Sequence, residues 1–471
     1  MRVLLADPPQ MFLVGDGLTR HVQPLGLGYL GAVLAPHHDV RFLLPDIRAY
    51  HGTDPWGELA RAIEAEAPDL LAITAVTATF PAATRLAALA KAVRPGVVVV
   101  LGGTHASADP HGVLRAAPDV DYAVQGEGEA AIVALAAMLA AHRVDAAAIP
   151  GLVWRTADGG VTVNASRTLD DLDAVPFPLR DPRHILWSED LHPAFFQALV
   201  TMRGCPYRCI YCAVPQSVDR KTRYRSPANV LAEIEHLRRD YDVPGLFFHD
   251  SVFSMHRERT IEICAGMAER GLALPFTCQT RTDRLDAELL DTMVAGGCSQ
   301  IFFGIESGDL ESLRRIRKKM SLESIRAAVD LVRSRGIRCS GFFIVGFPWE
   351  DEALIERTID FATSLGLDAI SLFSATPLPG TELWTLAGGS HLPDSIDFRT
   401  PQVNLTKLTD DAYLAIYERV KARIDDHNQA SMMVRVRAAL DPAAVSWWDE
   451  VPGDNPLVSL GRRRPALPQP G

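Results

Sequence analysis

Residues 203–214 read RGCPYRCIYCAV and contain Cys205, Cys209 and Cys212, three of the seven cysteines of the 471-residue chain. Three residues separate the first pair and two separate the second, so one short stretch holds three thiols. In a large chain without a recognisable secretion signal, clustered thiols favour metal binding over disulfide bonding. The stretch therefore predicts a sulfur-ligated metal centre with three ligands from one loop.

The number of cysteines separates two kinds of metal centre. Structural zinc takes four ligands in a closed tetrahedron, and residues 200–225 offer no fourth ligand of that kind, although His249 on a following strand is an alternative. A cubane iron–sulfur cluster takes one ligand for each iron. Three cysteines would hold three irons and leave the fourth iron open to a small molecule.

Around this loop, from residue 195 onward, apolar runs alternate with helical patterns. The runs with strand character are FFQALVTM (195–202), GLFFHD (245–250), PFTCQTR (275–281), SQIFFGIES (299–307), CSGFFIVGFP (339–348) and AISLFSATP (369–377). Six strands with five crossover helices predict an open or closed parallel (β/α)6 barrel over residues 193–390, with its chemistry at the carboxyl ends of the strands. Cys205 is expected directly after the first strand, on that face.

Residues 1–140 show a similar rhythm and predict a separate doubly wound, Rossmann-like α/β domain with a parallel sheet. Its strands read as buried on both faces. Ligands of such sheets bind beyond the carboxyl ends of the strands. The residues expected around that crevice include Asp7, Thr74, Thr77, Gly102, Gly103, His105, Gly126 and Glu127.

The remaining segments read as connections and a tail. Residues 141–192 predict a hairpin that turns at Asp158–Gly160, followed by a proline-rich linker. Residues 391–471 predict a small helical region with an N-cap near Thr409. Its proline-rich end is expected to be mobile.

Composition excludes several classes of function. The net charge of −11 argues against a nucleic-acid partner. The apolar run AAIVALAAMLAA, residues 130–141, has 12 residues and is too short to span a bilayer. We therefore expect a cytoplasmic protein without a membrane span.

The three cysteines, with Tyr211 before the last of them, resemble the signature of the radical S-adenosylmethionine (SAM) superfamily. The resemblance implies a 4Fe–4S cluster on Cys205, Cys209 and Cys212. It also implies that SAM binds the open iron and yields a 5′-deoxyadenosyl radical on reduction. An external electron donor of the flavodoxin or ferredoxin type would be required.

Further residues fit the same resemblance and imply a SAM site at the ends of the strands. Glu306 is expected near the ribose, Arg281 near the methionine carboxylate, and Gly346 where the backbone approaches the adenine. The complete set implied for SAM binding is Tyr211, Arg281, Glu306, Gly346 and Pro348. The segment FFHDSVF (247–253) resembles an acidic motif of the family, but Ser251 replaces its second acid, which leaves the role of Asp250 open.

A doubly wound domain before such a barrel resembles the cobalamin-binding subgroup of these enzymes. PLGLGYLGAVL, VVVVLGGTHAS and DYAVQGEGE carry the likeness, which covers about residues 1–390. The resemblance implies cobalamin in the crevice of the first domain. The Asp-x-His-x-x-Gly motif is absent because Gly112 directly follows His111, which implies cobalt without a protein imidazole below it.

The first hypothesis is a cobalamin-dependent radical SAM methyltransferase that acts on an unactivated carbon of a small specialised metabolite. The second keeps both cofactors but changes the outcome to rearrangement, ring contraction, cyclisation or oxidation. The third omits cobalamin, so that the first domain is a scaffold and the barrel performs deoxygenation or dehydrogenation. The residues themselves do not separate these reactions.

Overall fold

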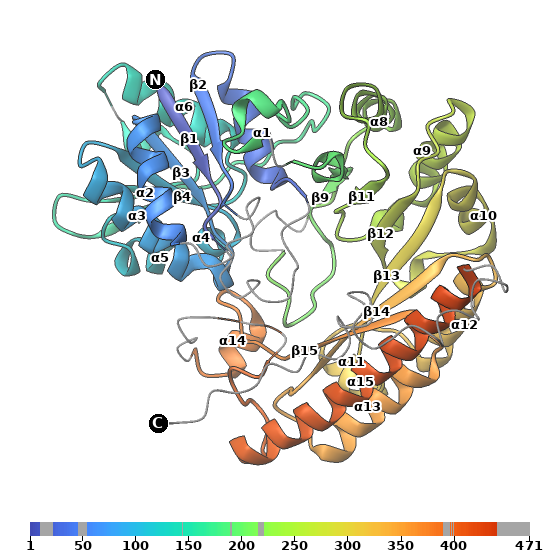
Figure 1. The fold of residues 1–471 in the computed structure, drawn as a ribbon. Helices are drawn as coiled ribbons and strands as arrows, with labels where there is room; N and C mark the ends of the chain where they lie inside the picture. The colour runs from blue at the N-terminus through green and yellow to red at the C-terminus, as the bar shows by residue number, and fades with distance from the viewer. Residues whose placement is uncertain are drawn as a thin grey trace, which may run out of the picture.

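The computed structural model describes residues 1–9, 22–45, 54–143, 145–188, 191–214, 221–389, 396, 398 and 400–439. Two α/β units lie side by side, each built on its own sheet (Figure 1). The first, in blue and cyan, contains the N-terminal strands, and the second, in yellow and orange, contains the strands that follow the cysteine loop. The two-unit α/β architecture agrees with the sequence prediction.

The first unit is built on a seven-stranded sheet with the order β2-β1-β3-β4-β5-β6-β7. Its strands are β1 (Arg2–Ala6), β2 (Asp39–Leu43), β3 (Leu70–Thr74), β4 (Val98–Gly102), β5 (Tyr122–Val124), β6 (Leu152–Arg155) and β7 (Val161–Val163). The strands β1 to β5 are parallel, and β6 and β7 are antiparallel to their neighbours. The carboxyl ends of β1 to β5 therefore meet at one edge of the sheet.

Helices cover both faces of this sheet, which explains its continuous apolar strands. The helices are α1 (Leu25–Leu34), α2 (Pro55–Glu66), α3 (Phe80–Val93), α4 (Thr104–Ala108), α5 (Pro110–Ala116) and α6 (Glu129–Ala140). Alternate strand residues belong to two hydrophobic cores. One core lies beneath α2 to α5. The other lies beneath α1 and α6 and is continuous with the core of the second unit.

The predicted hairpin forms, but it belongs to the first sheet rather than to the connection between the units. β6 pairs antiparallel with β5, with Tyr122 opposite Trp154. The turn is made at Gly159, whose φ of 83° lies in the left-handed region that glycine adopts without strain. The hairpin covers what would otherwise be the exposed edge of β5.

The second unit is an open sheet of six parallel strands with the order β15-β14-β13-β12-β11-β8. Its strands are β8 (Ala198–Leu199), β11 (Leu246–Phe248), β12 (Phe276–Thr280), β13 (Cys298–Glu306), β14 (Arg338–Val345) and β15 (Ala369–Ser374). The crossover helices are α8 (Pro227–Tyr241), α9 (Arg257–Glu269), α10 (Ala287–Ala295), α11 (Leu310–Arg315), α12 (Leu322–Arg333) and α13 (Glu352–Ser364). The predicted partial barrel is confirmed in its open form.

The first barrel strand is shorter than its apolar run predicted. β8 ends at Leu199, and a second pair of short strands, β9 (Met202–Arg203) and β10 (Arg223–Tyr224), follows. Cys205 therefore follows β9, and the expectation that it directly follows the first barrel strand is wrong. The buried Asp250 carboxylate accepts hydrogen bonds from the backbone N–H groups of Thr201 and Met202, at 2.7 and 3.0 Å, and these bonds turn the chain out of the sheet.

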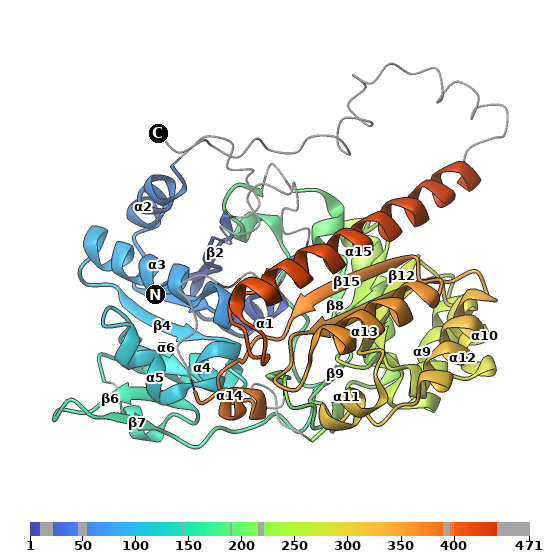
Figure 2. The ribbon, with the colours of Figure 1, turned by 90° about the horizontal axis from the view of Figure 1, so that it is seen from below.

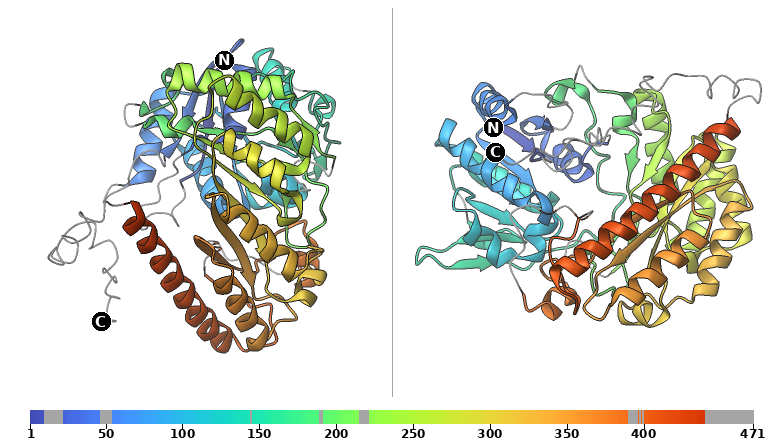
Figure 3. Two further views of the ribbon diagram at one scale, coloured as in Figure 1. Left: turned by 90° about the vertical axis from the view of Figure 1, so that its right-hand side faces the viewer. Right: turned by 60° about the horizontal axis from the view of Figure 1, so that its bottom comes forward.

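After β15 come the short helix α14 (Glu382–Leu386) and the long helix α15 (Asp410–Ala439), which begins at the predicted N-cap. Thr409 Oγ1 accepts a hydrogen bond from the Ala412 N–H. α15 lies beside α13 and along the outer edge of β15 (Figures 2 and 3). The expectation of a mobile end concerns residues outside the described part of the chain.

The apolar run at residues 130–141 falls on α6, whose Ile132 and Leu135 are buried in the core. In the part of the chain that the structure describes, no helix has both the length and the apolarity that crossing a membrane requires. The run thus forms part of a helix that packs into the core of the first unit.

Candidate functional site between the two sheets

The cysteine loop begins at a two-stranded clamp. In the antiparallel pair of β9 and β10, Arg203 lies opposite Arg223. Gly204 follows with a φ of 88°, and Cys205 comes next as a buried residue. Cys209 and Cys212 are partly buried. The clamp fixes the start of the loop at the carboxyl-terminal side of the six-stranded sheet.

The three thiols suit a cluster better than a single ion. Burial raises the pKa of Cys205 and raises that of Cys212 to about 11, and the charge of Cys209 adds to both shifts. Among the described residues, no three Asp, Glu, His or Cys side chains converge closely enough to bind one metal ion. A tetrahedral zinc site needs such convergence, whereas a cubane takes each cysteine at a different iron.

Tyr207 of the loop is held by two arginines. The guanidinium of Arg281 lies 3.9 Å from the centre of the Tyr207 ring, and Arg284 Nε donates a hydrogen bond to the Tyr207 hydroxyl at 2.8 Å. Arg281 Nε and Nη2 also bind the Asp283 carboxylate, and Nη2 donates to the Lys318 carbonyl. Arg281 thus lies beside the cluster loop, with two of its nitrogens already engaged. Its contact with the methionine carboxylate remains a prediction.

Glu306 ends β13 in a strained conformation. Its φ of 75° is uncommon for a residue with a side chain, and such strain concentrates at functional sites. Its Oε1 lies 3.0 Å from Lys318 Nζ, and both side chains are buried. Burial raises the pKa of Tyr211 well above its ordinary value, and the charge of Glu306 and a hydrogen bond to it raise it further. The structure thus brings the predicted Glu306 and Tyr211 together.

Lys318 was not predicted as a site residue. Its positive charge acts on both Cys205 and Cys212, so it lies close to the cluster loop. Two neighbours, Arg317 and Lys319, have positive φ values of 64° and 52°. In the sequence, Lys318 is one cation within RRIRKK, and nothing there distinguishes it from the others.

Gly346 follows β14 with a φ of 94°. A Cβ atom at this position would lie 2.0 Å from the hydroxyl of Tyr413 on α15. The packing of α15 therefore requires a glycine here, a reason that the sequence alone does not reveal. Phe347, directly after it, has its ring centre 6.3 Å from that of Tyr211. Gly346 and the half-buried Pro348 flank Phe347 in the sequence, and their contact with the adenine remains a prediction.

A cavity of about 370 Å³ lies between the two units. Its first wall belongs to α1 and to the carboxyl edge of the first sheet, and its second wall comes from the barrel. Of the residues predicted for cobalamin, the lining includes Thr74, Gly102, Gly103, Gly126 and Glu127. The barrel contributes Val200, Met202, Arg203, Gly204, Val214, His249 and Ser251.

Three residues predicted for cobalamin do not line this cavity. Asp7 is buried directly after β1. His105 stacks on Phe80 with ring centres 4.0 Å apart, and its Nδ1 lies 3.3 Å from Thr77 Oγ1. Burial favours the neutral ring and lowers the pKa of His105 to about 4, although the nearby charge of Asp109 acts to raise it. His105 and Thr77 therefore contact each other and do not belong to the lining of the cavity.

An ionic cluster joins the two units beside the cavity. Arg203 Nη1 lies 3.2 Å from Glu127 Oε1, and Arg203 Nη2 lies 2.6 Å from Glu129 Oε1. Arg223 Nη1 lies 2.8 Å from Glu127 Oε2. Burial acts to raise the pKa of Glu127, but the bonds from Arg223 and Leu169 and the charge of Arg203 outweigh it and lower that pKa. Glu127, which was predicted to bind cobalamin, thus forms ion pairs with Arg203 and Arg223.

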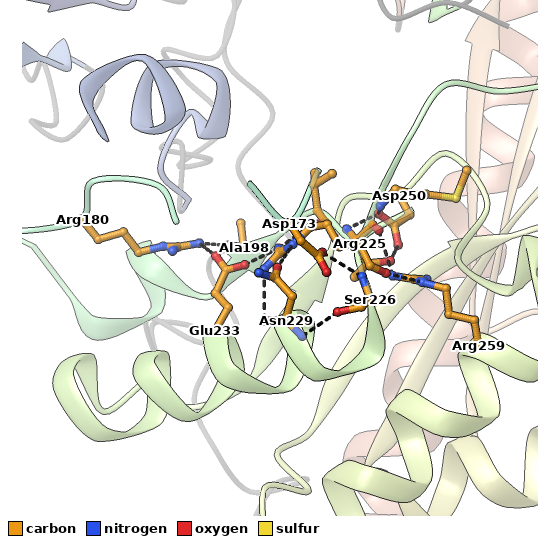
Figure 4. Close-up of polar contacts among 12 residues, drawn as sticks. Asp173, Arg180, Ala198, Arg225, Ser226, Asn229, Glu233, Asp250 and Arg259 are labelled. Carbon is orange, nitrogen blue, oxygen red and sulfur yellow. Dashed lines mark hydrogen bonds and ion pairs between the residues drawn. The ribbon is translucent and has the colours of Figure 1, made fainter. Parts of the chain in front are cut away.

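Figure 4 shows the polar network behind the cysteine loop. Asp250 holds the Thr201 and Met202 backbone, and Arg259 Nη2 donates to the Thr201 carbonyl at 2.8 Å. Burial raises the pKa of Asp250, against the effect of its hydrogen bonds. The open role of Asp250 is therefore resolved in part, because its carboxylate positions the backbone that leads into the cysteine loop.

The network continues to the segment that connects the two units. Arg225 Nη1 donates to the Val200 carbonyl at 2.8 Å and also binds the fully buried Glu233. Arg180, from the connecting segment, lies 2.7 Å from the other oxygen of Glu233 and donates to the Ala198 carbonyl (Figure 4). Buried charges of this kind are stable only when paired. The network therefore ties the connection, the first barrel strand and the loop together.

Comparison with known proteins agrees with this arrangement. The profile of the Radical SAM superfamily matches residues 199–362, and that of the B12 binding domain matches residues 14–136. The uncharacterized methyltransferase PH0819 of Pyrococcus horikoshii is 31% identical, over 90% of this chain and 94% of that protein. Cytidylyl-2-hydroxyethylphosphonate methyltransferase of Streptomyces wedmorensis is 27% identical, over 81% and 80% of the two chains.

Among solved structures, the radical SAM methyltransferase TsrM from Kitasatospora setae, with cobalamin and a 4Fe–4S cluster bound, has a TM-score of 0.68. The likeness covers 82% of this chain and 78% of that chain at 20% identity, and it shows a shared fold. The cobalamin-dependent radical SAM enzyme OxsB with aqua-cobalamin bound has a TM-score of 0.64 at 19% identity, over 82% and 55% of the two chains.

The chain is an enzyme of the radical SAM superfamily. Within it, the chain belongs to the members that carry a cobalamin-binding domain in front of the barrel, as the sequence predicted. Its cofactors are a 4Fe–4S cluster, SAM and cobalamin. The assignment of the three loop cysteines to the cluster, and of the cavity between the sheets to cobalamin, remains a prediction.

Proposed function

We propose that the protein is a cobalamin-dependent radical SAM methyltransferase that methylates an unactivated carbon of a small molecule. One observation carries the proposal: a single cavity has residues of the cobalamin-binding domain on one wall and the start of the cysteine loop on the other. The names of the two curated relatives, both methyltransferases, support the reaction type.

When bound, the cluster and SAM supply a 5′-deoxyadenosyl radical, and cobalamin supplies a methyl carrier. The protein positions these groups. Cys205, Cys209 and Cys212 hold three irons, and the Glu306–Lys318 pair offers opposite charges beside them to the polar groups of SAM. Arg203 keeps the cysteine loop in register with the crevice of the first domain.

Two further parts of the proposal concern the setting of the reaction. The radical chemistry needs one electron at a time, and we place its source in an external flavodoxin- or ferredoxin-type protein. We place the enzyme in the cytoplasm, where thiols stay reduced. The electron source is tested by replacing dithionite with flavodoxin and its reductase. Equal formation of 5′-deoxyadenosine with the two reductants would support the proposed donor.

The proposal is tested by anaerobic reconstitution with iron, sulfide and hydroxocobalamin, followed by desalting and metal analysis. We expect about four irons together with near-stoichiometric cobalt. SAM with a trideuterated methyl group is then added with a reductant, and mass spectrometry follows the label in the protein-bound corrin. Label in the corrin supports methyl transfer. Bound cobalt without label in the corrin would contradict methyl transfer. Bound iron without cobalt would show that the first domain does not bind cobalamin and serves as a scaffold.

A further inference from the structure

The inner face of the second sheet is lined by side chains that are only partly buried. In β13, β14 and β15, alternate residues such as Phe303, Phe343 and Leu372 are buried in the core beneath the helices. The residues between them point to the opposite face of the sheet, because successive side chains alternate. Ser340 and Glu306 of this set are buried, whereas Phe302, Phe342 and Phe373 are partly exposed.

Three of these inner residues are phenylalanines, and the ring of Phe342 lies between the other two. The rings of Phe302 and Phe342 lie with their centres 5.5 Å apart and their planes 6° apart. Phe373 follows with its centre 6.0 Å from that of Phe342 and a plane tilted by 57°. In the described part of the chain, none of the three belongs to a hydrophobic core or packs against one. We call these residues the phenylalanine stack.

The stack lies on the strands that end at the predicted SAM residues. Phe302 precedes Glu306 by four residues on β13, and Phe342 precedes Gly346 by four residues on β14. At about 3.3 Å per residue, the rings lie roughly 13 Å along the strands from those residues. The rings therefore lie on the face of the sheet opposite its core-facing residues, on the same strands as Glu306 and Gly346 but nearer the amino-terminal ends.

The geometry of the stack selects the kind of group that it can bind. Phe302 and Phe342 turn their faces to each other, so a third group meets mainly their edges. Ring edges carry partial positive charge and ring faces partial negative charge. The face of an aromatic ring is therefore a better partner for these edges than a saturated ring of the same size, which has no such charge distribution.

We propose that the phenylalanine stack is a substrate-binding surface and that the substrate carries an aromatic ring system. The proposal rests on the proposed function, because it takes the inner face of the barrel as the place of the reacting molecule. The ring system lies against Phe302, Phe342 and Phe373, and the carbon to be modified lies toward Glu306 and Gly346. The partly exposed Gln279, on the neighbouring strand β12, offers hydrogen bonds to its polar groups.

The test compares two probes with the same carbon skeleton, 2-naphthol and decahydro-2-naphthol. Equilibrium dialysis under anaerobic conditions gives the dissociation constant of each for the reconstituted protein. We expect 2-naphthol to bind about fivefold more tightly than its saturated counterpart. Phe302→Leu and Phe342→Leu keep an apolar side chain but remove the ring, and each should abolish this preference with little change for decahydro-2-naphthol.

Phe177→Leu is the matched control, since Phe177 is a partly buried ring outside the barrel interior that lies near Arg225. Equal binding of the two probes, no detectable binding of 2-naphthol, or the same effect from Phe177→Leu would overturn the inference. Iron, cobalt and 5′-deoxyadenosine are measured on the same preparations. Loss of cobalt or of the methyl label speaks against the proposed function, whereas loss of the probe preference alone speaks only against the aromatic substrate.

Discussion

Arg203 and Glu129 join the two units of the protein through an ion pair of 2.6 Å. Arg203 stands two residues before Cys205, and Glu129 is the first residue of α6. The guanidinium of Arg203 therefore links the cysteine loop directly to the cobalamin-binding domain. Both side chains are largely buried, so removal of one partner leaves a charge without compensation.

Arg203→Met should destabilise the protein, because Glu129 loses its partner and Glu127 keeps only Arg223. Breaking a buried pair in this way costs about 3 kcal/mol or more. Thermal unfolding of the apoprotein measures the loss, and cobalt retained after reconstitution should fall with it. Arg208→Met, at an exposed arginine of the same loop, is the control. An unchanged melting temperature for Arg203→Met would contradict the assigned contact.

Replacement of Cys205, Cys209 or Cys212 by Ala should abolish the cluster absorbance and all cleavage of SAM, because each cysteine holds a different iron. Cys339→Ala, at a core thiol in β14, is the comparison. It should retain iron even if it lowers stability. Formation of 5′-deoxyadenosine by any one of the three loop variants would refute the cluster assignment.

Gly102→Leu should lower cobalt content while iron content stays the same. Gly102 lines the cavity, and a Cβ atom at this position meets nothing within 4 Å, so the new side chain enters the cavity without disturbing the backbone. Gly103 is a poorer test, since a Cβ there would lie 2.6 Å from the Ala75 carbonyl oxygen. Gly96→Leu, equally unobstructed but in the turn before β4, is the control. Equal cobalt content in both variants would show that cobalamin does not bind beside Gly102.

Glu350→Gln should change how stability depends on pH. Burial raises the pKa of Glu350 to about 7, although its Oε2 accepts hydrogen bonds from the Gly346 and Phe347 N–H groups. Between about pH 4.5 and pH 7 the unfolded chain has lost this proton while the folded protein keeps it, so rising pH destabilises the fold.

Glutamine carries no such proton. The free energy of unfolding of Glu350→Gln, relative to that of the wild type, should therefore increase by about 2 to 3 kcal/mol from pH 5 to pH 8 and then level off. Denaturant unfolding of both proteins across this range measures the difference. Glu269→Gln, at an exposed glutamate of α9, should leave the pH profile unchanged. A constant difference between Glu350→Gln and the wild type at all pH values would exclude a buried, protonated Glu350.

The parts of this structure that depend on local patterns were predictable. The cysteine spacing, the alternation of strands and helices, and the cap at Thr409 are properties of neighbouring residues. Features set by contacts between distant segments were not predictable. β8 ends early because Asp250, about 50 residues later, binds the Thr201 and Met202 backbone.

The candidate site shows the same division. Glu306 follows an apolar strand and could be selected for that reason, whereas Lys318 becomes a site residue only because its turn folds back on Glu306. His105 was grouped with the crevice because of its position after β4, but its ring turns toward Phe80. Strand position predicts the edge at which a residue lies, while neighbours decide where its side chain points.

β15 ends the six-stranded sheet on one side, and Asn428 of α15 pairs with both the N–H and the carbonyl of Ile370 at 2.8 Å. An amide side chain thus takes the place that the backbone of another strand would occupy. Without it, β15 would offer unpaired backbone groups as a template for strand addition by a second molecule. The long helix that places Asn428 there consequently occupies, at Ile370, the sheet edge that an added strand would need.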